Sequence, residues 1–250
     1  MSEQILTSFA TYPYIEESLT ALEFAYQIRD FDVLRGKLEE WFPRPGPGMR
    51  KRVVREIIRR FIRHENNQVL DTPLLAFVNA DLSKQAKKEV LYYHFVQVHP
   101  IVTATLKELR TTETATITSD DAKTAIFKLL GKEIAKKGVN AVLATFVEFG
   151  LMERVNTRQK RFVPQKLEQP SFLYVLYQHF LAEGSIAPKN SDIQNFFYDT
   201  YNMPEETCEQ LITANSGVFY VIERKAHLNQ SLLKFNAIED FMAKLLECRW

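Results

Sequence analysis

The stretch from Met49 to His64, MRKRVVREIIRRFIRH, separates apolar from basic side chains in the pattern of an amphipathic helix. At about 100° per residue, one face of this helix is apolar and holds Val53, Val54, Ile57, Ile58, Phe61 and Ile62. The opposite face is basic and holds Arg52, Arg55, Arg59 and Arg63. We therefore predict a helix that buries one side in a core and presents cations on the other.

The charges of this stretch are one-sided. Glu56 is its only acid, against the basic residues Arg50, Lys51, Arg52, Arg55, Arg59, Arg60 and Arg63. Exposed helices usually mix charges, because opposite charges three or four residues apart stabilise a helix. Arginine predominates here, and its planar guanidinium binds phosphate oxygens in pairs. The row from Arg52 to Arg63 rises about 16 Å, the reach of several backbone phosphates. The pattern predicts nucleic-acid binding, with a solvated basic face as the alternative.

The net charge of +1 conceals a basic centre between two acidic ends. Residues 1–48 carry a net charge of −4, residues 49–166 carry +10 and residues 167–250 carry −5. Such asymmetry indicates an anionic partner for the centre of the chain. The 46% hydrophobic and 25% charged residues are typical of a globular protein, and 250 residues suffice for a sizeable core.

The first 110 residues are predicted to form an N-terminal helical domain that contains the basic helix. We expect helices over 14–28, 31–42, 73–80 and 84–110, with the last one kinked or interrupted by Pro100 near His99. The run from Pro43 to Gly48 should end the second helix and redirect the chain before the basic helix. His94 lies among aromatic residues and is interpreted as a packing residue.

Residues 111–166 have the order of elements of a winged helix-turn-helix unit. Helices are expected over 120–134 and 139–149, separated by a turn at 136–138, and two short strands over 151–155 and 161–164. The hairpin tip between the strands is basic, with Arg154, Arg158, Lys160 and Arg161. The second helix exposes Asn140, Ala141, Ala144, Thr145 and Glu148, which supply few donors for reading bases. We expect this unit to contact the DNA backbone with weak sequence preference, or else to serve in packing or protein contact.

Residues 167–250 are predicted to form an acidic C-terminal α+β unit with a similar order of elements. Helices are expected over 171–182, from 191 to about 201, over 205–214 and over 237–248, with a loop over 184–190 and strands over 218–223 and 232–235. Acidic surfaces repel phosphates, so this unit is expected to bind protein rather than DNA. The predicted fold class is thus mostly α: a helical bundle followed by winged-helix-like α+β units.

Recognised catalytic and metal-binding motifs are absent from the sequence. There is no HExxH, GxxxxGK[ST] or GxSxG motif, the five histidines are scattered, and Cys208 and Cys248 form no CxxC pair. We expect no enzymatic activity, metal or cofactor. No signal-like segment and no run of 18 apolar residues is present, so a cytoplasmic protein without a membrane partner is expected.

Several short motifs resemble the BrxA family of the BREX bacteriophage-exclusion systems. They are Ser8-Phe9, the run Tyr14 to Leu19, Arg29-Asp30-Phe31 with Val33-Leu34, and the run Lys51 to Arg60. Leu91-Tyr92-Tyr93 and the helices between Ala122 and Leu151 fit more loosely, so the resemblance covers roughly residues 8–165. Ala10 to Pro13 replaces the family's small, Gly-containing run, and residues 170–250 exceed the usual length.

The resemblance implies a mostly helical, two-part fold, partly like the antitermination factor NusB. It also implies double-stranded DNA binding without catalytic activity, with the contacts on Arg52, Arg55, Arg59 and Arg63. We predict a largely sequence-independent DNA-binding accessory protein of a prokaryotic phage-defence system, with other defence proteins as partners. A protein-interaction scaffold and a winged-helix transcription regulator are the alternatives, and the residues alone do not distinguish DNA from RNA.

Overall fold

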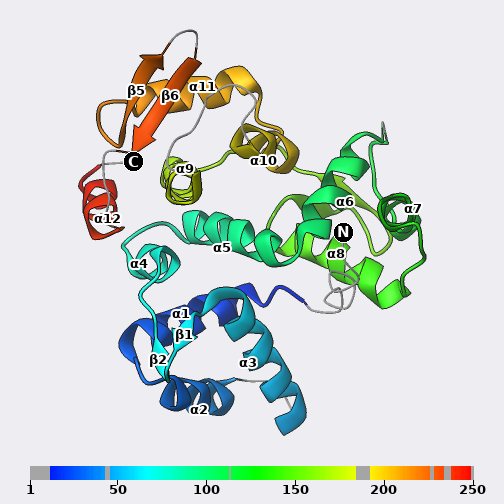
Figure 1. Cartoon of the computed structure of the whole chain (residues 1–250). Helices are drawn as coiled ribbons and strands as arrows, with labels where there is room; N and C mark the ends of the chain where they lie inside the picture. Colours follow the sequence, from blue (N-terminus) through cyan, green and yellow to red (C-terminus); the bar gives the residue numbers. More distant parts are fainter. Residues whose placement is uncertain are drawn as a thin grey trace.

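The computed structural model describes residues 12–42, 46–112, 114–183, 192–225, 228–233 and 238–248. In these residues the fold is mostly helical, with twelve helices and three small antiparallel hairpins (Figure 1). The predicted fold class is confirmed. None of the described helices has both the length and the hydropathy that a membrane crossing requires.

Helix α5 (Lys84–Val98) runs through the centre of the molecule (Figure 1). It packs against α1 (Ile15–Gln27), α3 (Pro47–Phe61), α4 (Pro73–Asn79), α6 (Pro100–Arg110) and α9 (Gln169–Glu183). Because neighbours surround it, its buried residues lie on all sides of the helix rather than on one face: Ala86, Glu89, Val90, Leu91, Tyr92, Tyr93, Phe95 and Val96. His99 ends α5 and Pro100 begins α6, as the sequence predicts.

The N-terminal helices pack below α5 in Figure 1, and α3 contacts both α2 (Phe31–Trp41) and α5. Helix α3 begins at Pro47, two residues earlier than predicted, after Gly46 with φ +83°. Residues 43–45 of the predicted turn lie outside the described part of the chain. Helix α3 ends at Phe61 rather than continuing to His64, because the chain becomes extended at Ile62.

A short hairpin, β1 (His64–Glu65) with β2 (Gln68–Val69), follows α3 and was not predicted from the sequence. Its turn residues Asn66 and Asn67 have φ of +47° and +60°, a conformation that asparagine tolerates well. Asn67 also fixes the start of α2. Its carbonyl accepts the N–H of Phe31 at 2.9 Å, and its side-chain oxygen accepts the N–H of Asp32 at 3.1 Å. The hairpin therefore holds the beginning of α2 against the end of α3.

The winged-helix order of elements is present from α6 onward. It consists of α6, a bridge at Ile117, α7 (Ser119–Leu130), α8 (Lys136–Glu148), β3 (Met152–Arg154) and β4 (Lys160–Phe162). Helix α6 packs against α7, although the predicted domain boundary falls between them. Both strands are shorter than predicted, and Lys160 rather than Arg161 begins β4.

Two boundaries in this unit differ from the sequence prediction. Helix α7 begins at Ser119 after its cap Thr118, which forms a reciprocal pair with Asp121, and it ends at Leu130 instead of the predicted residue 134, because Gly131 is left-handed with φ +67°. Helix α8 starts at Lys136, so residues 136–138 are its first turn and not a separate turn. Thr145 is buried and donates to the carbonyl of Ala141 at 2.9 Å, which corrects its predicted exposure.

The C-terminal part covers α5 from the other side through α9. It continues with α10 (Asp192–Tyr201), α11 (Glu205–Ala214), β5 (Tyr220–Lys225), β6 (Leu228–Leu233) and α12 (Ile238–Glu247). The strands pair from Tyr220 with Leu233 to Lys225 with Leu228, so β6 begins four residues before its predicted start. The predicted loop at 184–190 lies outside the described residues.

Candidate nucleic-acid interface

The outer face of α3 carries the exposed cations Lys51, Arg52, Arg55 and Arg59, and Arg63 follows in the extended segment after the helix; we call these five the α3 row. The opposite face is anchored in the core by Val53, Val54, Ile57 and Phe61, each at most 3% exposed. This division follows from the sequence spacing, and it gives the helix a fixed orientation. Because the apolar face is held by the core, the cations lie on the exposed side of the helix.

Few carboxylates neutralise the α3 row. Glu56 accepts from Arg59 at 2.7 Å and lies 3.7 Å from Arg60. Within the described residues, no salt bridge joins an acid to Lys51, Arg52, Arg55 or Arg63. Ion pairs with the protein's own carboxylates would have neutralised the predicted anion-binding surface. Among the described residues, Glu56 is the one acid that forms such a pair with the α3 row.

Arg60 is buried and does not belong to the α3 row, which corrects its prediction as a phosphate contact. It is 3% exposed, because it falls only about 20° around the helix from the buried Val53. Its Nε donates to Nε2 of His99 at 3.1 Å, and Nη1 donates to the carbonyl of Tyr12 at 3.1 Å. Burial lowers the pKa of Arg60 to about 10, so the group stays charged at neutral pH.

Arg50 is only partly available. It is half-buried and lines a hollow with Glu39 and Glu40 of α2, which Lys51 also lines, but Lys51 is exposed and Arg50 is not. Its position follows from the early start of the helix, since the first turn of α3 faces the C-terminal end of α2. We therefore omit Arg50 and Arg60 from the candidate site.

The hairpin of β3 and β4, which we call the wing, presents a second group of cations. Arg154, Arg158 and Arg161 are exposed, and Lys160 is half-buried. Arg161 pairs with Glu153 across the strands, but Arg154 lies directly opposite Lys160. Burial, with a further contribution from Arg154, lowers the pKa of Lys160. Like charges placed opposite each other destabilise a hairpin, so an anion bound between them would stabilise it.

The early start of α8 adds two cations that the sequence did not assign to the site. Lys136 and Lys137 lie exposed in the first turn of α8. The N-terminal turn of the second helix is the part that enters the DNA groove in helix-turn-helix proteins. Asn140 is exposed one turn later. The charge of this helix start was visible in the sequence, but its helical conformation was not.

Tyr12 connects α3 with the end of α8. Its carbonyl accepts from Arg60 of α3, and its hydroxyl donates to Glu148 at the end of α8. Burial and the bonded Glu148 raise the pKa of Tyr12 to about 12, while Arg154 of the wing acts in the opposite direction. The two basic surfaces therefore flank one common segment of the chain.

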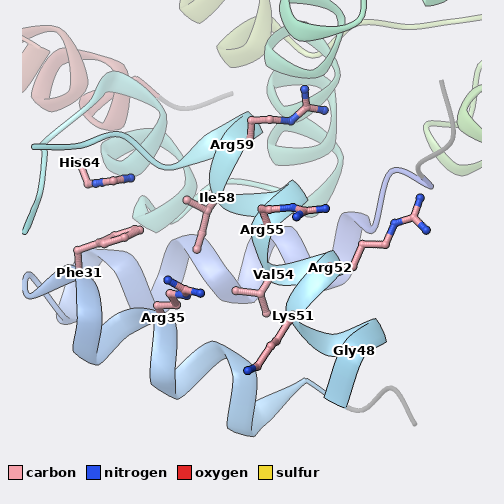
Figure 2. A pocket seen from close by; sticks show the side chains of 10 residues that line it. All are labelled: Phe31, Arg35, Gly48, Lys51, Arg52, Val54, Arg55, Ile58, Arg59 and His64. Atoms are coloured by element: carbon pink, nitrogen blue, oxygen red, sulfur yellow. The ribbon is translucent and has the colours of Figure 1, made fainter. Parts of the chain in front are cut away.

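A groove of about 800 Å³ lies between α2 and α3, which we call the α2–α3 groove (Figure 2). Five of its ten lining residues are cations and none is an acid. The lining consists of Phe31, Arg35, Gly48, Lys51, Arg52, Val54, Arg55, Ile58, Arg59 and His64. Phe31 and His64 stack at one end, with ring centroids 3.6 Å apart and planes inclined by 12°. The sequence did not predict this groove, because Phe31 and Arg35 come from α2 while His64 comes from β1, about thirty residues further along the chain.

In the described residues, no group of three or more His, Cys, Asp or Glu side chains has the arrangement that would hold a metal ion. His94, interpreted from the sequence as a packing residue, lies between α5 and α9 with a ring nitrogen 2.7 Å from the hydroxyl of Tyr174.

Comparison with known proteins gives a fold relationship. No protein-family model and no curated protein matches this chain. The crystal structure of a protein called SspB is similar, with a TM-score of 0.54 over 95% of this chain and 87% of the SspB chain, at 12% identity. At that identity the similarity concerns the fold alone. The resemblance to the BrxA family stays a prediction, and its motif Ser8-Phe9 lies outside the described residues.

Proposed function

We propose that this protein is a non-enzymatic, largely sequence-independent binder of double-stranded DNA and an accessory protein of a prokaryotic phage-defence system. The observation that carries the proposal is the α3 row: four exposed cations on a helix whose opposite face is held by the core, and a fifth, Arg63, just after the helix. Phosphates supply most of the affinity of sequence-independent DNA binding, and arginine is well suited to grip them.

The wing and the first turn of α8 would provide further backbone contacts. Winged helix-turn-helix units place the second helix in a groove and the hairpin along the adjacent backbone. Asn140, Ala141 and Ala144 of α8 offer little for direct base recognition, which favours weak sequence preference. The phage-defence role rests on the resemblance to the BrxA family. Genes for a methyltransferase and a large ATPase next to the gene of this protein would support it.

Salt-dependent DNA binding tests the interface. The affinity of the wild type for a 24-base-pair duplex, a length of about two helical turns, would be measured by fluorescence anisotropy across a series of salt concentrations. Replacing Arg52, Arg55 and Arg59 by Gln removes three phosphate contacts, so the slope of log K against log salt should fall in magnitude by about 3.

A charge-matched control removes three exposed cations from elsewhere, in Lys84→Gln, Lys107→Gln and Lys123→Gln, whose side chains are 64%, 62% and 47% exposed. This control should keep the wild-type slope to within about 1. Equal slopes for the two triple variants would refute the assignment of the α3 row. Competition by an RNA duplex of the same length would show whether binding is confined to DNA.

A further inference from the structure

The α2–α3 groove has both a cationic rim and an apolar, aromatic interior, and a paired duplex would contact only the first. Its rim is cationic, and its floor includes Val54 and Ile58, with the Phe31–His64 stack at one end (Figure 2). In a paired duplex the bases are stacked on each other, so a flat surface contact offers mainly phosphates to the protein. An unpaired nucleotide offers a phosphate and also the free face of a base.

We propose that the α2–α3 groove binds an unpaired nucleotide of DNA, such as a bulged or displaced base next to a duplex held by the α3 row. The base would extend the stack of Phe31 and His64, and its flanking phosphates would lie against Arg35, Lys51 and Arg55. This inference rests on the proposed duplex binding and adds a second kind of DNA contact to it.

Three features of the groove support this occupant. Its volume of about 800 Å³ falls in the range of small-ligand sites, roughly 300–1,000 Å³. The lining has five cations and no acid, which favours an anion. The aromatic pair is already assembled, because Asn67 bonds the backbone of Phe31 and Asp32 and so fixes the start of α2 beside the β1–β2 hairpin. A stacking platform that is formed before binding costs little ordering when the base arrives.

Arg35 is well placed to distinguish this site from the duplex contact. It comes from α2, opposite the α3 row, and extends toward the groove between the two helices (Figure 2). Its ion pair with Glu39 at 3.3 Å leaves 56% of the side chain exposed. Lys37 lies two residues further along α2, is exposed and does not line the groove, so it provides a matched control.

The test compares a paired duplex with the same duplex carrying a single unpaired 2-aminopurine, measured by anisotropy and by the fluorescence of the probe base. Wild type should bind the bulged duplex about tenfold more tightly, the effect expected of one base–aromatic stack, and the probe fluorescence should change on binding. His64→Ala and Arg35→Gln should abolish this preference and leave the paired duplex bound as by wild type. Lys37→Gln should keep the preference, and His64→Tyr, which retains a ring, should restore it.

The outcomes separate this inference from the proposed function. Tight binding of the paired duplex without any preference for the bulge, or a preference that survives both His64→Ala and Arg35→Gln, overturns the inference and leaves duplex binding in place. Binding of the bulged duplex alone supports the groove and refutes duplex binding by the α3 row. Displacement of the bulged duplex by micromolar AMP would assign the groove to a free nucleotide and overturn its assignment to DNA.

Discussion

At the residue scale, Arg60 shows how one arginine in a basic stretch can have a structural role. Its guanidinium bonds His99 and the carbonyl of Tyr12, and it lies 4.9 Å from the centre of the Phe95 ring. These contacts join α3 to α5 and to the segment that reaches α8. A buried cation without its partners lowers the stability of the folded protein, and so do buried acceptors without their cation.

Replacing Arg60 by Met should therefore destabilise the protein, whereas replacing the adjacent Arg59 should not. Arg60→Met leaves buried acceptors on His99 and Tyr12 without their donor and should lower the free energy of unfolding by about 3 kcal/mol. Arg59→Met removes an ion pair in which the arginine side chain is 44% exposed and leaves Glu56 beside Arg60, so it should change this free energy by less than about 1 kcal/mol. Urea denaturation of both variants measures the difference, and similar losses would contradict the structural role of Arg60.

His99 makes the stability of the fold depend on pH. Burial, together with the charges of Arg60 and Arg59, lowers the pKa of His99 from 6.5 to about 3. Between pH 6.5 and about pH 3, His99 is therefore protonated in the unfolded chain and neutral in the folded chain. The stabilisation is complete above pH 6.5 and is lost as the pH falls toward 3, at about 1.4 kcal/mol per pH unit.

Urea denaturation at pH 7, 6 and 5 measures this dependence. His94 should add to it, since burial lowers its pKa to about 4. His99→Gln, which can still accept a hydrogen bond from Arg60, should show a shallower decline than wild type over this interval. An unchanged decline in this variant would show that other groups cause it.

At the element scale, helix ends decide where the cations of the winged-helix unit point. Gly131 ends α7 in a left-handed conformation, with φ +67° and ψ 9°, and α8 starts five residues later. This early start brings Lys136 and Lys137 into the first turn of the helix. The short connection between the two helices therefore sets which residues of α8 stand at its exposed end.

Two glycine substitutions should have opposite effects on stability. Gly131→Ala places a β-carbon on a left-handed residue and should lower the free energy of unfolding by about 1 kcal/mol. Gly36 lies inside α2, with open space around the position of an added β-carbon, so Gly36→Ala should raise it by about 0.5–1 kcal/mol. Thermal unfolding of both variants tests this pair, and a shift of the same sign would contradict the assigned backbone conformations.

Helix existence could be predicted from the sequence better than helix ends. The 3.6-residue apolar period located α3, and Pro100 correctly separated α5 from α6. The start of α8 was missed because Lys136 and Lys137 carry no apolar signal: a first turn needs no buried face. Arg60 was misassigned because periodicity places it at the border of two faces, and only the position of His99 from another helix decides that it turns inward.

At the scale of the whole molecule, the α3 row and the wing belong to separate parts of the fold, and Tyr12 joins these parts by bonding Arg60 of α3 and Glu148 of α8. The central helix α5 packs against both α3 and α6 and thereby holds the two parts in a defined relation. The α2–α3 groove could not be predicted from the sequence, since its aromatic pair joins residues 31 and 64 only after the hairpin has folded.

If one duplex contacts both surfaces, their contributions should combine. Arg154→Gln with Arg158→Gln should lower the magnitude of the salt slope by about 2, and combining them with the three α3 substitutions should lower it by about 5. The losses in binding free energy should add to within about 0.5 kcal/mol, since the sites are independent. A wing variant that binds like wild type would confine the interface to α3.

The facing cations of the wing have a consequence for its motion. Only three residue pairs join β3 to β4, and one of them sets Arg154 against Lys160. Without a counterion, the hydrogen bonds between β3 and β4 should open and close more often than those of the neighbouring helices. A bound polyanion should reduce this local opening. Amide protons such as that of Lys160, which bonds Ile117 at 2.9 Å, should then exchange with deuterium more slowly once heparin is added. The rate of amide exchange in the wing would therefore show whether a polyanion is bound there.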